Sequence, residues 1–316
     1  MRKIQIDSIP TDLKPSVATV GFFDGVHLGH QHLIRQVVEE ARQRGLESMV
    51  VTFDRHPRQV LSPDFHPQLL TSFEEKMARL AKTGVDNCVV LHFTPEMAAL
   101  SAGEFMEKVL VGLLGVKVLV VGYDNRFGHS RSEGFDDYVR HGEALGVDVL
   151  ESTPLSVGDI RVSSSAIRKM LLQGDMETAT KCLGHQYTLA GRVVEGYQQG
   201  RLLGFPTANL HMEDVAKMLP APGVYVARVR VEGSVEIMRA VTNIGLRPTF
   251  QGHGMAIETH VIGYEGDLYG KRMLVALVHR LREERKFENT SFLVSQMYED
   301  VRQANAFFDE EDASKR

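Results

Sequence analysis

Apolar and polar residues alternate in blocks along the first 150 residues. Short runs that are apolar at almost every position, many of them β-branched, are typical of strands buried on both faces of a parallel sheet. These runs are residues 17–22, 49–53, 88–93, 116–122 and 147–150. Amphipathic segments such as 30–44 lie between them and predict helices. The alternation of strand and helix predicts a doubly wound, Rossmann-like α/β domain with a parallel sheet.

Two motifs mark where helices begin in this half. Glu75 follows Ser72 after three residues, and Glu104 follows Ser101 in the same way. In such a capping box the serine side chain accepts from the amide of the glutamate, and the glutamate side chain accepts from the amide of the serine. Each motif therefore predicts a helix that begins directly after its serine.

The pattern changes near Gly184. Strand-like runs now follow one another without intervening helices and are separated by Gly, Pro and Asn. They are residues 187–194, 224–231, 237–243, 257–264 and 273–281, with a helical segment at 291–305. This order predicts a small antiparallel barrel or sandwich closed by a C-terminal helix. We therefore expect two domains, residues 1–183 and 184–316, and a frayed, solvated acidic tail after Phe308.

Composition and charge narrow the class of protein. With 316 residues, 43% of them hydrophobic, the chain can bury a sizeable core. Its 41 acidic and 36 basic residues give a net charge of −5, which argues against broad nucleic-acid binding but allows a local site for a small phosphate ligand. Cys88 and Cys182 lie in apolar surroundings and predict buried, inert thiols. No apolar run reaches signal-peptide length or the ~20 residues of a membrane span, so we expect a cytoplasmic protein without a membrane partner.

The sequence GFFDGVHLGHQ, residues 21–31, forms the first turn from strand to helix. In open parallel sheets such turns commonly meet phosphate, and the following helix offers its first amides to an anion. His27 lies about one helical turn before His30, so both imidazoles can converge on one phosphate group and stabilise the charge that develops on it.

Two other interpretations of this histidine pair stay open at this point. The histidines are polar surface residues at a helix start, or they bind zinc, although neither the spacing His-Glu-x-x-His nor a nearby cysteine supports zinc. The patterns Gly-x4-Gly-Lys-[Ser/Thr] and Gly-x-Gly-x-x-Gly are absent, which argues against a P-loop ATPase and a dehydrogenase.

The motif HLGH, residues 27–30, resembles the His-x-Gly-His signature of nucleotidylyltransferases. Three more motifs follow in order: VTFDRHP at 51–57, VVGYDNRFG at 120–128 and VSSSAIR at 162–168. Together they resemble the adenylyltransferase half of the bacterial bifunctional riboflavin kinase/FAD synthetase family. The chain departs from the common pattern at Arg55, Asn125 and Ser165, where the family usually has proline, phenylalanine and threonine.

The resemblance implies roles for individual residues of the first half. It implies that His27 and His30 contact ATP phosphates and stabilise the transition state, with Arg168 on the opposite side of the triphosphate. The other implied ATP-binding residues are Gly21, Phe22, Asp24, Gly29, Ser164 and Ser165, and the implied flavin-binding residues are Asp54, Asp124 and Asn125. Simple turn or capping roles are the alternative for the three aspartates and for the serines.

The second half contains a candidate metal site in GRLLGFPTANL, residues 200–210. Thr207 and Asn209 are two positions apart, so in an extended segment their side chains point to the same side. A hydroxyl and an amide carbonyl are hard oxygen ligands suited to Mg²⁺ that also carries substrate phosphates. The alternative is a Pro-Thr turn in which Asn209 bonds its own backbone.

Further motifs make this half similar to riboflavin kinase across residues 191–304. They are PGVY at 222–225, NIGLRPTF at 243–250, IETH at 257–260, DLYG at 267–270 and LREERKF at 281–287. The resemblance implies a six-stranded β-barrel, Mg²⁺ held with ATP at Thr207 and Asn209, and Glu258 as the base that deprotonates the ribityl 5′-hydroxyl. Partial desolvation within an apolar strand would also favour such a base, although a salt bridge to an arginine is the structural alternative.

The remaining implied residues surround these groups. Gly200, Arg201 and Gly204 would form a flap over the nucleotide phosphates, and Arg282 with Phe287 would border the flavin. Solvated or paired arginines and a core phenylalanine are the alternatives.

These patterns predict a bifunctional enzyme with the small-molecule substrates riboflavin, FMN and ATP. Mg²⁺ accompanies ATP in the phosphorylation of riboflavin to FMN, and adenylylation of FMN then gives FAD. An adenylyl- or cytidylyltransferase with another acceptor would leave the motifs of the second half unexplained. A catalytically silent flavin sensor is disfavoured by the presence of Glu258, Thr207, Asn209 and both histidines.

Overall fold

The computed structural model describes residues 1–62, 64–123, 125–129, 132–196, 199–249 and 252–314. The chain divides into two compact units, Met1–Ser164 and Ser165–Arg316. The predicted domain division at 183/184 lies at the end of a helix within the second unit. Among the described residues, no helix is both long and apolar enough to cross a membrane.

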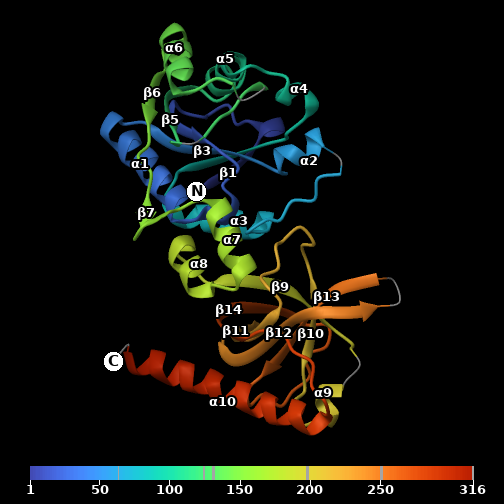
Figure 1. Cartoon of the computed structure of the whole chain (residues 1–316). Coiled ribbons are helices and arrows are strands. Elements are labelled where there is room, and N and C mark those ends of the chain that lie inside the picture. The colour runs from blue at the N-terminus through green and yellow to red at the C-terminus, as the bar shows by residue number, and fades with distance from the viewer. Residues whose placement is uncertain (63, 124, 130–131, 197–198, 250–251, 315–316) are drawn as a thin grey trace. The chain divides into compact units, whose positions relative to one another are not determined.

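The first unit contains a parallel six-stranded sheet (Figure 1). Its strands, in the spatial order β1-β4-β3-β2-β5-β6, are β1 (Arg2–Gln5), β4 (Asn87–Leu91), β3 (Glu47–Phe53), β2 (Ser16–Val20), β5 (Val116–Val121) and β6 (Asp148–Glu151). The order reverses between β2 and β5, which is where open parallel sheets bind ligands. The predicted α/β class is confirmed, and β1 is an edge strand that the hydrophobic pattern did not predict.

Helices bury both faces of this sheet. On one face, α1 (Leu28–Arg44) and α3 (Phe73–Leu80) pack against alternate strand residues such as Val17 and Val50. On the other, α5 (Ala102–Phe105), the π-helix Met106–Val111 and α6 (Phe135–Leu145) pack against Ala18 and Val51. Short helices α2 (Pro57–Leu61) and α4 (Pro95–Ala98) and a small hairpin of β7 (Ser156–Val157) and β8 (Ile160–Arg161) complete the unit. Two-sided burial explains why these strands are apolar at consecutive positions.

Both predicted capping boxes are present. Ser72 Oγ accepts from the amide of Glu75, and the Glu75 carboxylate accepts from the amide of Ser72. Ser101 and Glu104 form the same reciprocal pair at the start of α5. The predicted buried, unbridged state of Cys88 and Cys182 is likewise found.

The second unit is built on a closed antiparallel barrel. Around the barrel the order is β10-β13-β12-β11-β14-β9, with strands β9 (Tyr187–Val194), β10 (Ala208–Met212), β11 (Gly223–Val231), β12 (Met238–Thr249), β13 (Gly252–Val261) and β14 (Arg272–Arg282). Helices α7 (Ser164–Gln173) and α8 (Met176–Leu183) precede it, and α9 (Gln199–Leu202) lies between β9 and β10. The expected barrel is confirmed. The hydrophobic pattern did not distinguish strand β10 from the loop that precedes it.

The C-terminal helix α10 (Thr290–Ser314) packs along the outside of the barrel (Figure 1). Its Ala304 and Phe308 join Val224, Val226 and Val241 in a small second core. The expectation of a frayed acidic tail is wrong, because the helix continues through it and its acids meet arginines of the barrel. Asp309 and Asp312 lie 2.8 and 2.9 Å from the guanidinium of Arg239, and Glu311 pairs with Arg228.

Phe308→Ala should destabilise the second unit. The ring is only 2% exposed, so its removal leaves a cavity that costs about 3–5 kcal/mol of the free energy of unfolding. Urea denaturation followed by circular dichroism measures this loss.

Phe292→Ala on the same helix is the matched control. This ring is 57% exposed, and its loss should change the stability by less than about 0.5 kcal/mol. Similar losses for both variants would contradict the packing of α10 described above.

Candidate active sites

The turn after β2 has a backbone that side chains rarely adopt. Phe23 and Val26 have positive φ angles of 55° and 40°, and Gly25 has 83°. A β-branched residue at positive φ is an outlier, and each such position costs about 1–3 kcal/mol. The surrounding structure must therefore hold this turn in place.

Asp24 provides one of these restraints. Its buried carboxylate accepts from the amides of Leu70 and Thr71 at 2.9 to 3.1 Å and from the Thr71 hydroxyl at 3.3 Å. The Thr71 hydroxyl oxygen also accepts from the amide of Gly25 at 3.0 Å. These contacts give Asp24 a structural role in the turn, and its binding of ATP stays a prediction.

His27 and His30 lie against each other at the start of α1. Their rings are stacked with centroids 3.6 Å apart and an angle of 16° between their planes. His27 is the N-cap of the helix, and its Nδ1 accepts from the amide of His30 at 3.2 Å. Because Nδ1 accepts this hydrogen bond, the ring of His27 carries its proton on Nε2.

His30 is held in its neutral form. Burial, together with the charges of His27 and Lys76, places the pKa of His30 well below its ordinary value. Its Nδ1 is buried and has no hydrogen-bond partner among the described residues. The Phe23 ring meets the His30 ring edge-on at 5.2 Å, so the strained turn directly orients this imidazole.

Glycines allow the close packing of this site. A Cβ on Gly29 would come within 3.2 Å of the His27 ring and of the Val162 carbonyl oxygen, and one on Gly21 within 3.0 Å of the Phe23 ring. Ser164 donates its hydroxyl to the carbonyl of Asp24 at 3.0 Å, which brings the last predicted motif of the first half to the turn. Ser165 and Arg168 belong to the second compact unit, and their binding of the triphosphate stays a prediction.

The predicted flavin-side residues follow β3 and β5, the two strands that flank β2 in the sheet. Asp54 follows β3, and its Oδ2 lies 2.9 Å from Nδ1 of His92, whose Nε2 lies 2.9 Å from Asp7. Asn125 donates its side-chain amide to the carbonyl of Val20 at the end of β2. Asp124 lies outside the described residues.

Titration of the Asp54 group follows from its contacts. Burial alone would raise the pKa of Asp54, but hydrogen bonds from His92 and from the amides of Phe93 and Arg55 outweigh it and lower that pKa. The hydrogen bond with Asp54 raises the pKa of His92 above its ordinary value.

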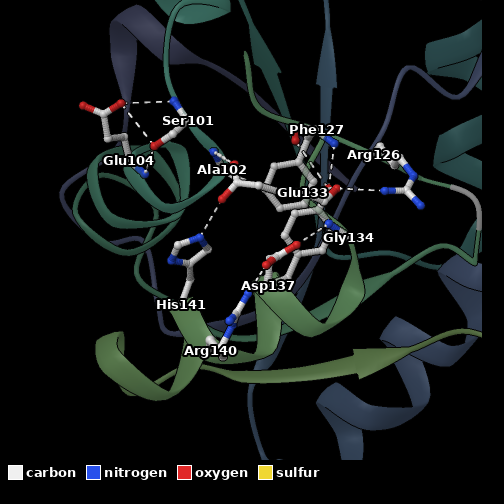
Figure 2. A network of polar contacts seen from close by, with 11 residues as sticks. Ser101, Ala102, Glu104, Arg126, Phe127, Glu133, Gly134, Asp137, Arg140 and His141 are labelled. Atoms are coloured by element: carbon white, nitrogen blue, oxygen red, sulfur yellow. Dashed lines mark hydrogen bonds and ion pairs between the residues drawn. The ribbon is translucent and has the colours of Figure 1, made fainter. Parts of the chain in front are cut away.

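A polar network fixes the loop after Asn125. Figure 2 shows the Glu133 carboxylate between the amide of Ala102, at 2.9 Å, and Nε2 of His141, at 2.8 Å. The carbonyl of Glu133 accepts from Arg126 at 3.2 Å and from the hydroxyl of the buried Tyr138. The hydrogen bond from His141 is the main cause that lowers the pKa of Glu133. This network connects Arg126 and Glu133 with α5 and α6.

Sequence reasoning missed Lys76 on α3, although the residue is only 3% exposed. Its Nζ lies within 3.3 Å of three oxygen atoms near the turn after β2. A signal was present, because Lys76 falls three residues after Phe73 and four before Leu80. That spacing places it on the apolar face of the predicted helix.

In the barrel, predicted catalytic and metal-binding residues share one row. Asn209 of β10 is paired with Glu258 of β13, which is paired in turn with Asn243 of β12. Residues paired across antiparallel strands point to the same face, here the outer face, because their neighbours Ala208 and Ile257 are buried inside. Asn243 is a member of this row that the sequence did not identify as a site residue.

Two cavities near this row have one lining residue in common. One, of about 370 Å³, is bounded by Glu258, Asn243, Arg282 and Phe287 and by residues of α10. The other, of about 640 Å³, is bounded by Arg201, Asp267 and Tyr269. Thr207 lines both cavities.

The walls of the first cavity are held by ion pairs and rings. Arg282 donates to both oxygens of the buried Asp300 on α10 at 2.9 and 2.8 Å, so the arginine is paired as well as cavity-lining. The Phe287 ring lies 5.8 Å from the Arg282 guanidinium and 4.9 Å from that of Arg285. Asp300 is thus a further residue of this wall that the sequence did not reveal.

The loop before β10 fits a small cation. Asn209 Oδ1 is buried and has no hydrogen-bond partner among the described residues. A Cβ on Gly200 would approach Thr207 Oγ1 to 3.2 Å and the Phe205 carbonyl to 2.4 Å, and one on Gly196 would clash with the Asn209 amide. A hydroxyl oxygen and an amide oxygen without a hydrogen-bond partner among the described residues are hard ligands of the kind that suit Mg²⁺. Gly204, at φ 82° with open space beside it, forms the turn of this loop.

Comparison with known proteins finds a family match for each part of the chain. Residues 9–166 match the family model described as FAD synthetase, and residues 183–308 match that of Riboflavin kinase. The bifunctional riboflavin kinase/FMN adenylyltransferase of Escherichia coli K12 is 37% identical over 292 residues, covering 92% of each chain, and that of Listeria monocytogenes is 34% identical over 301 residues, covering 94% of each. A crystal structure from Streptococcus pneumoniae, named as a Macrolide-efflux Protein, has a TM-score of 0.87 and 31% identity and covers 96% of this chain and 99% of its own.

The fold and the two matched models define a two-site transferase of flavin biosynthesis. The chain belongs to the bifunctional riboflavin kinase/FMN adenylyltransferase family, whose two activities produce FMN and FAD.

The imidazole of His92 should titrate above the ordinary histidine pKa of about 6.5. Its protonated form is stabilised by Asp54, so the resulting contribution to stability is present below about pH 6.5 and is lost as the pH rises through the raised pKa of His92. Proton NMR of the imidazole signals measures the titration.

Asp54→Asn removes the acceptor charge and should lower the pKa of His92. Asp64→Asn, at an exposed position that is not among the carboxylates paired with His92, should leave that pKa unchanged. A His92 pKa at or below 6.5 in the unaltered protein would refute the Asp54 hydrogen bond.

Proposed function

We propose that the barrel carries the riboflavin kinase reaction and that the turn after β2 carries the adenylyl transfer to FMN. The observation that carries the first assignment is Thr207, which lines both the cavity with Glu258 and the cavity with Arg201. A residue common to two adjoining cavities lies where an alcohol and a nucleotide phosphate would meet.

In the kinase site, riboflavin occupies the cavity beside α10 and ATP occupies the cavity bounded by Arg201 and Asp267. Glu258 takes the proton of the ribityl 5′-hydroxyl, whose oxygen attacks the γ-phosphorus, and ADP leaves. Thr207 and Asn209 would hold Mg²⁺, which would neutralise charge on the phosphates. Arg282, fixed by Asp300, and Phe287 border the isoalloxazine.

In the adenylyltransferase site, the phosphate of FMN attacks the α-phosphorus of ATP and pyrophosphate leaves. No protein nucleophile is needed, so catalysis rests on positioning and on stabilisation of phosphate charge. His27 and His30 donate to the phosphates beside the amides at the start of α1, with Gly21, Phe22 and Gly29 shaping the turn. Asp54 and Asn125 lie on the flavin side. We assign the whole protein to the cytoplasm. Its substrates are the small molecules riboflavin, FMN and ATP.

Single substitutions should separate the two reactions. His30→Ala removes a phosphate donor and should lower FAD formation from FMN about 100-fold or more while FMN formation stays within twofold. Glu258→Gln removes the base and should lower FMN formation by about 10²–10⁴-fold while sparing FAD formation from FMN. Chromatography of riboflavin, FMN and FAD after incubation with ATP and Mg²⁺ measures both reactions.

The exposed His129, which the proposal gives no catalytic part, provides the matched control His129→Ala. Equal loss of both products in either variant would contradict the assignment of one reaction to each site.

Asn209→Ala should raise the Mg²⁺ concentration that gives half-maximal FMN formation, because one hard oxygen ligand is lost. We expect an increase of about tenfold, measured by magnesium titration at saturating ATP. FAD formation from FMN by the same preparation is the internal control. An unchanged dependence of FMN formation on the Mg²⁺ concentration would show that Asn209 is not a metal ligand.

A further inference from the structure

Lys76 is a buried cation below the turn after β2. Its Nζ donates to the carbonyl of Phe53 at 2.9 Å, to the carbonyl of Phe22 at 3.2 Å and to Thr52 Oγ1 at 3.3 Å. Phe53 ends β3, and Phe22 lies two residues beyond β2. One ammonium group therefore links the carboxyl ends of two neighbouring strands.

The contacts of Lys76 lead to the catalytic histidines. The Phe22 ring lies 4.3 Å from Nζ, and the Phe22 carbonyl also accepts from Thr52 at 3.2 Å. The next residue, Phe23, enters the left-handed region and places its ring 5.2 Å from that of His30. Fixing both the ring and the carbonyl of Phe22 thus fixes the start of the strained turn that orients His30.

The charge of Lys76 is only distantly compensated. In the part of the chain that the structure describes, no carboxylate lies within 4 Å of its Nζ. The charged or titratable groups that act on it are Asp24, Asp54, Cys88 and His30. Burial lowers the pKa of Lys76 to about 8, and burial raises the pKa of Cys88 to about 11. A buried cation without a close anion favours binding of an anionic ligand nearby.

We propose that protonated Lys76 is a positioning residue of the adenylyltransferase site, where it holds the Phe22–Phe23 turn and thereby the His30 imidazole against the ATP phosphates. The proposal rests on the proposed function of that turn. It identifies Lys76 as a requirement for FAD formation that lies beneath the site and does not touch the substrate.

A pH profile distinguishes this role from simple packing. The pH dependence of kcat/KM reports groups of the free enzyme. In the unaltered protein, kcat/KM for ATP in FAD formation should fall about tenfold or more between pH 8 and pH 9.5 as Lys76 loses its proton. FMN formation by the same chain, with the same ATP, should not show this fall.

Three variants complete the test. Lys76→Met should lower kcat/KM for ATP in FAD formation by about 100-fold, because the turn is no longer held, while leaving FMN formation within twofold. Lys76→Arg should retain more activity than Lys76→Met and lose the decline above pH 8, since arginine stays protonated there. Lys3→Met is the matched control, because this exposed lysine lies over the nearby Phe73 ring at 4.7 Å without contacting the turn.

The outcomes separate this proposal from the proposed function. If His30→Ala abolishes FAD formation but Lys76→Met stays within threefold of Lys3→Met, the role of Lys76 is refuted and that of the turn survives. If His30→Ala has no effect, the proposed function of the turn itself fails. If Lys76→Met does not fold, the pH profiles of kcat/KM for the unaltered protein and for Lys76→Arg test the proposal instead. A flat profile from pH 7 to 9.5 in the unaltered protein refutes it.

Discussion

The first site depends on how backbone carbonyls are satisfied where parallel strands end. A buried carbonyl that leaves the ladder needs a new donor, and here side chains provide it. Lys76 donates to Phe22 and Phe53, and Asn125 donates to Val20. These bonds hold a turn in which two non-glycine residues have positive φ angles, a conformation that would be costly without them. The position of the stacked histidine pair therefore depends on buried hydrogen bonds beneath the turn.

The second site follows from a different constraint. The interior of a six-stranded barrel is filled by its own side chains, such as Tyr187, Tyr225 and Leu277, so polar chemistry has to lie outside. The row from Asn209 to Asn243 occupies that outer face, and α10 supplies the wall of the cavity beside it. Phe308 fixes the helix by packing, while Asp300 connects it to Arg282 by a buried ion pair.

The two sites treat the same nucleotide differently. The proposed adenylyltransferase site offers the neutral imidazole of His30, the ring of His27 and helix amides, which would favour phosphate charge without adding a protein nucleophile. The proposed kinase site offers a carboxylate and hard oxygens, which would suit activation of an alcohol and binding of a cation. FMN, the product of the kinase reaction, is the substrate of the adenylyl transfer. One chain therefore supports two successive steps of flavin biosynthesis.

The sequence by itself determined the features that depend on residues close together along the chain. Buried strands, the capping boxes at Ser72 and Ser101, the histidine spacing and the Thr207–Asn209 pair are local patterns, and each predicted its element or candidate site. Only the tertiary structure decided the edge strand β1, the helical tail, the carboxylate contacts of Asp24 and the positions of Lys76 and Asp300. Asp24 meets Thr71, 47 residues away, and Arg239 meets Asp312, 73 residues away. Hydrophobic periodicity shows which face of a helix or strand is apolar. The partner of a polar side chain depends on how distant segments pack together, and a local sequence pattern carries no information on that packing.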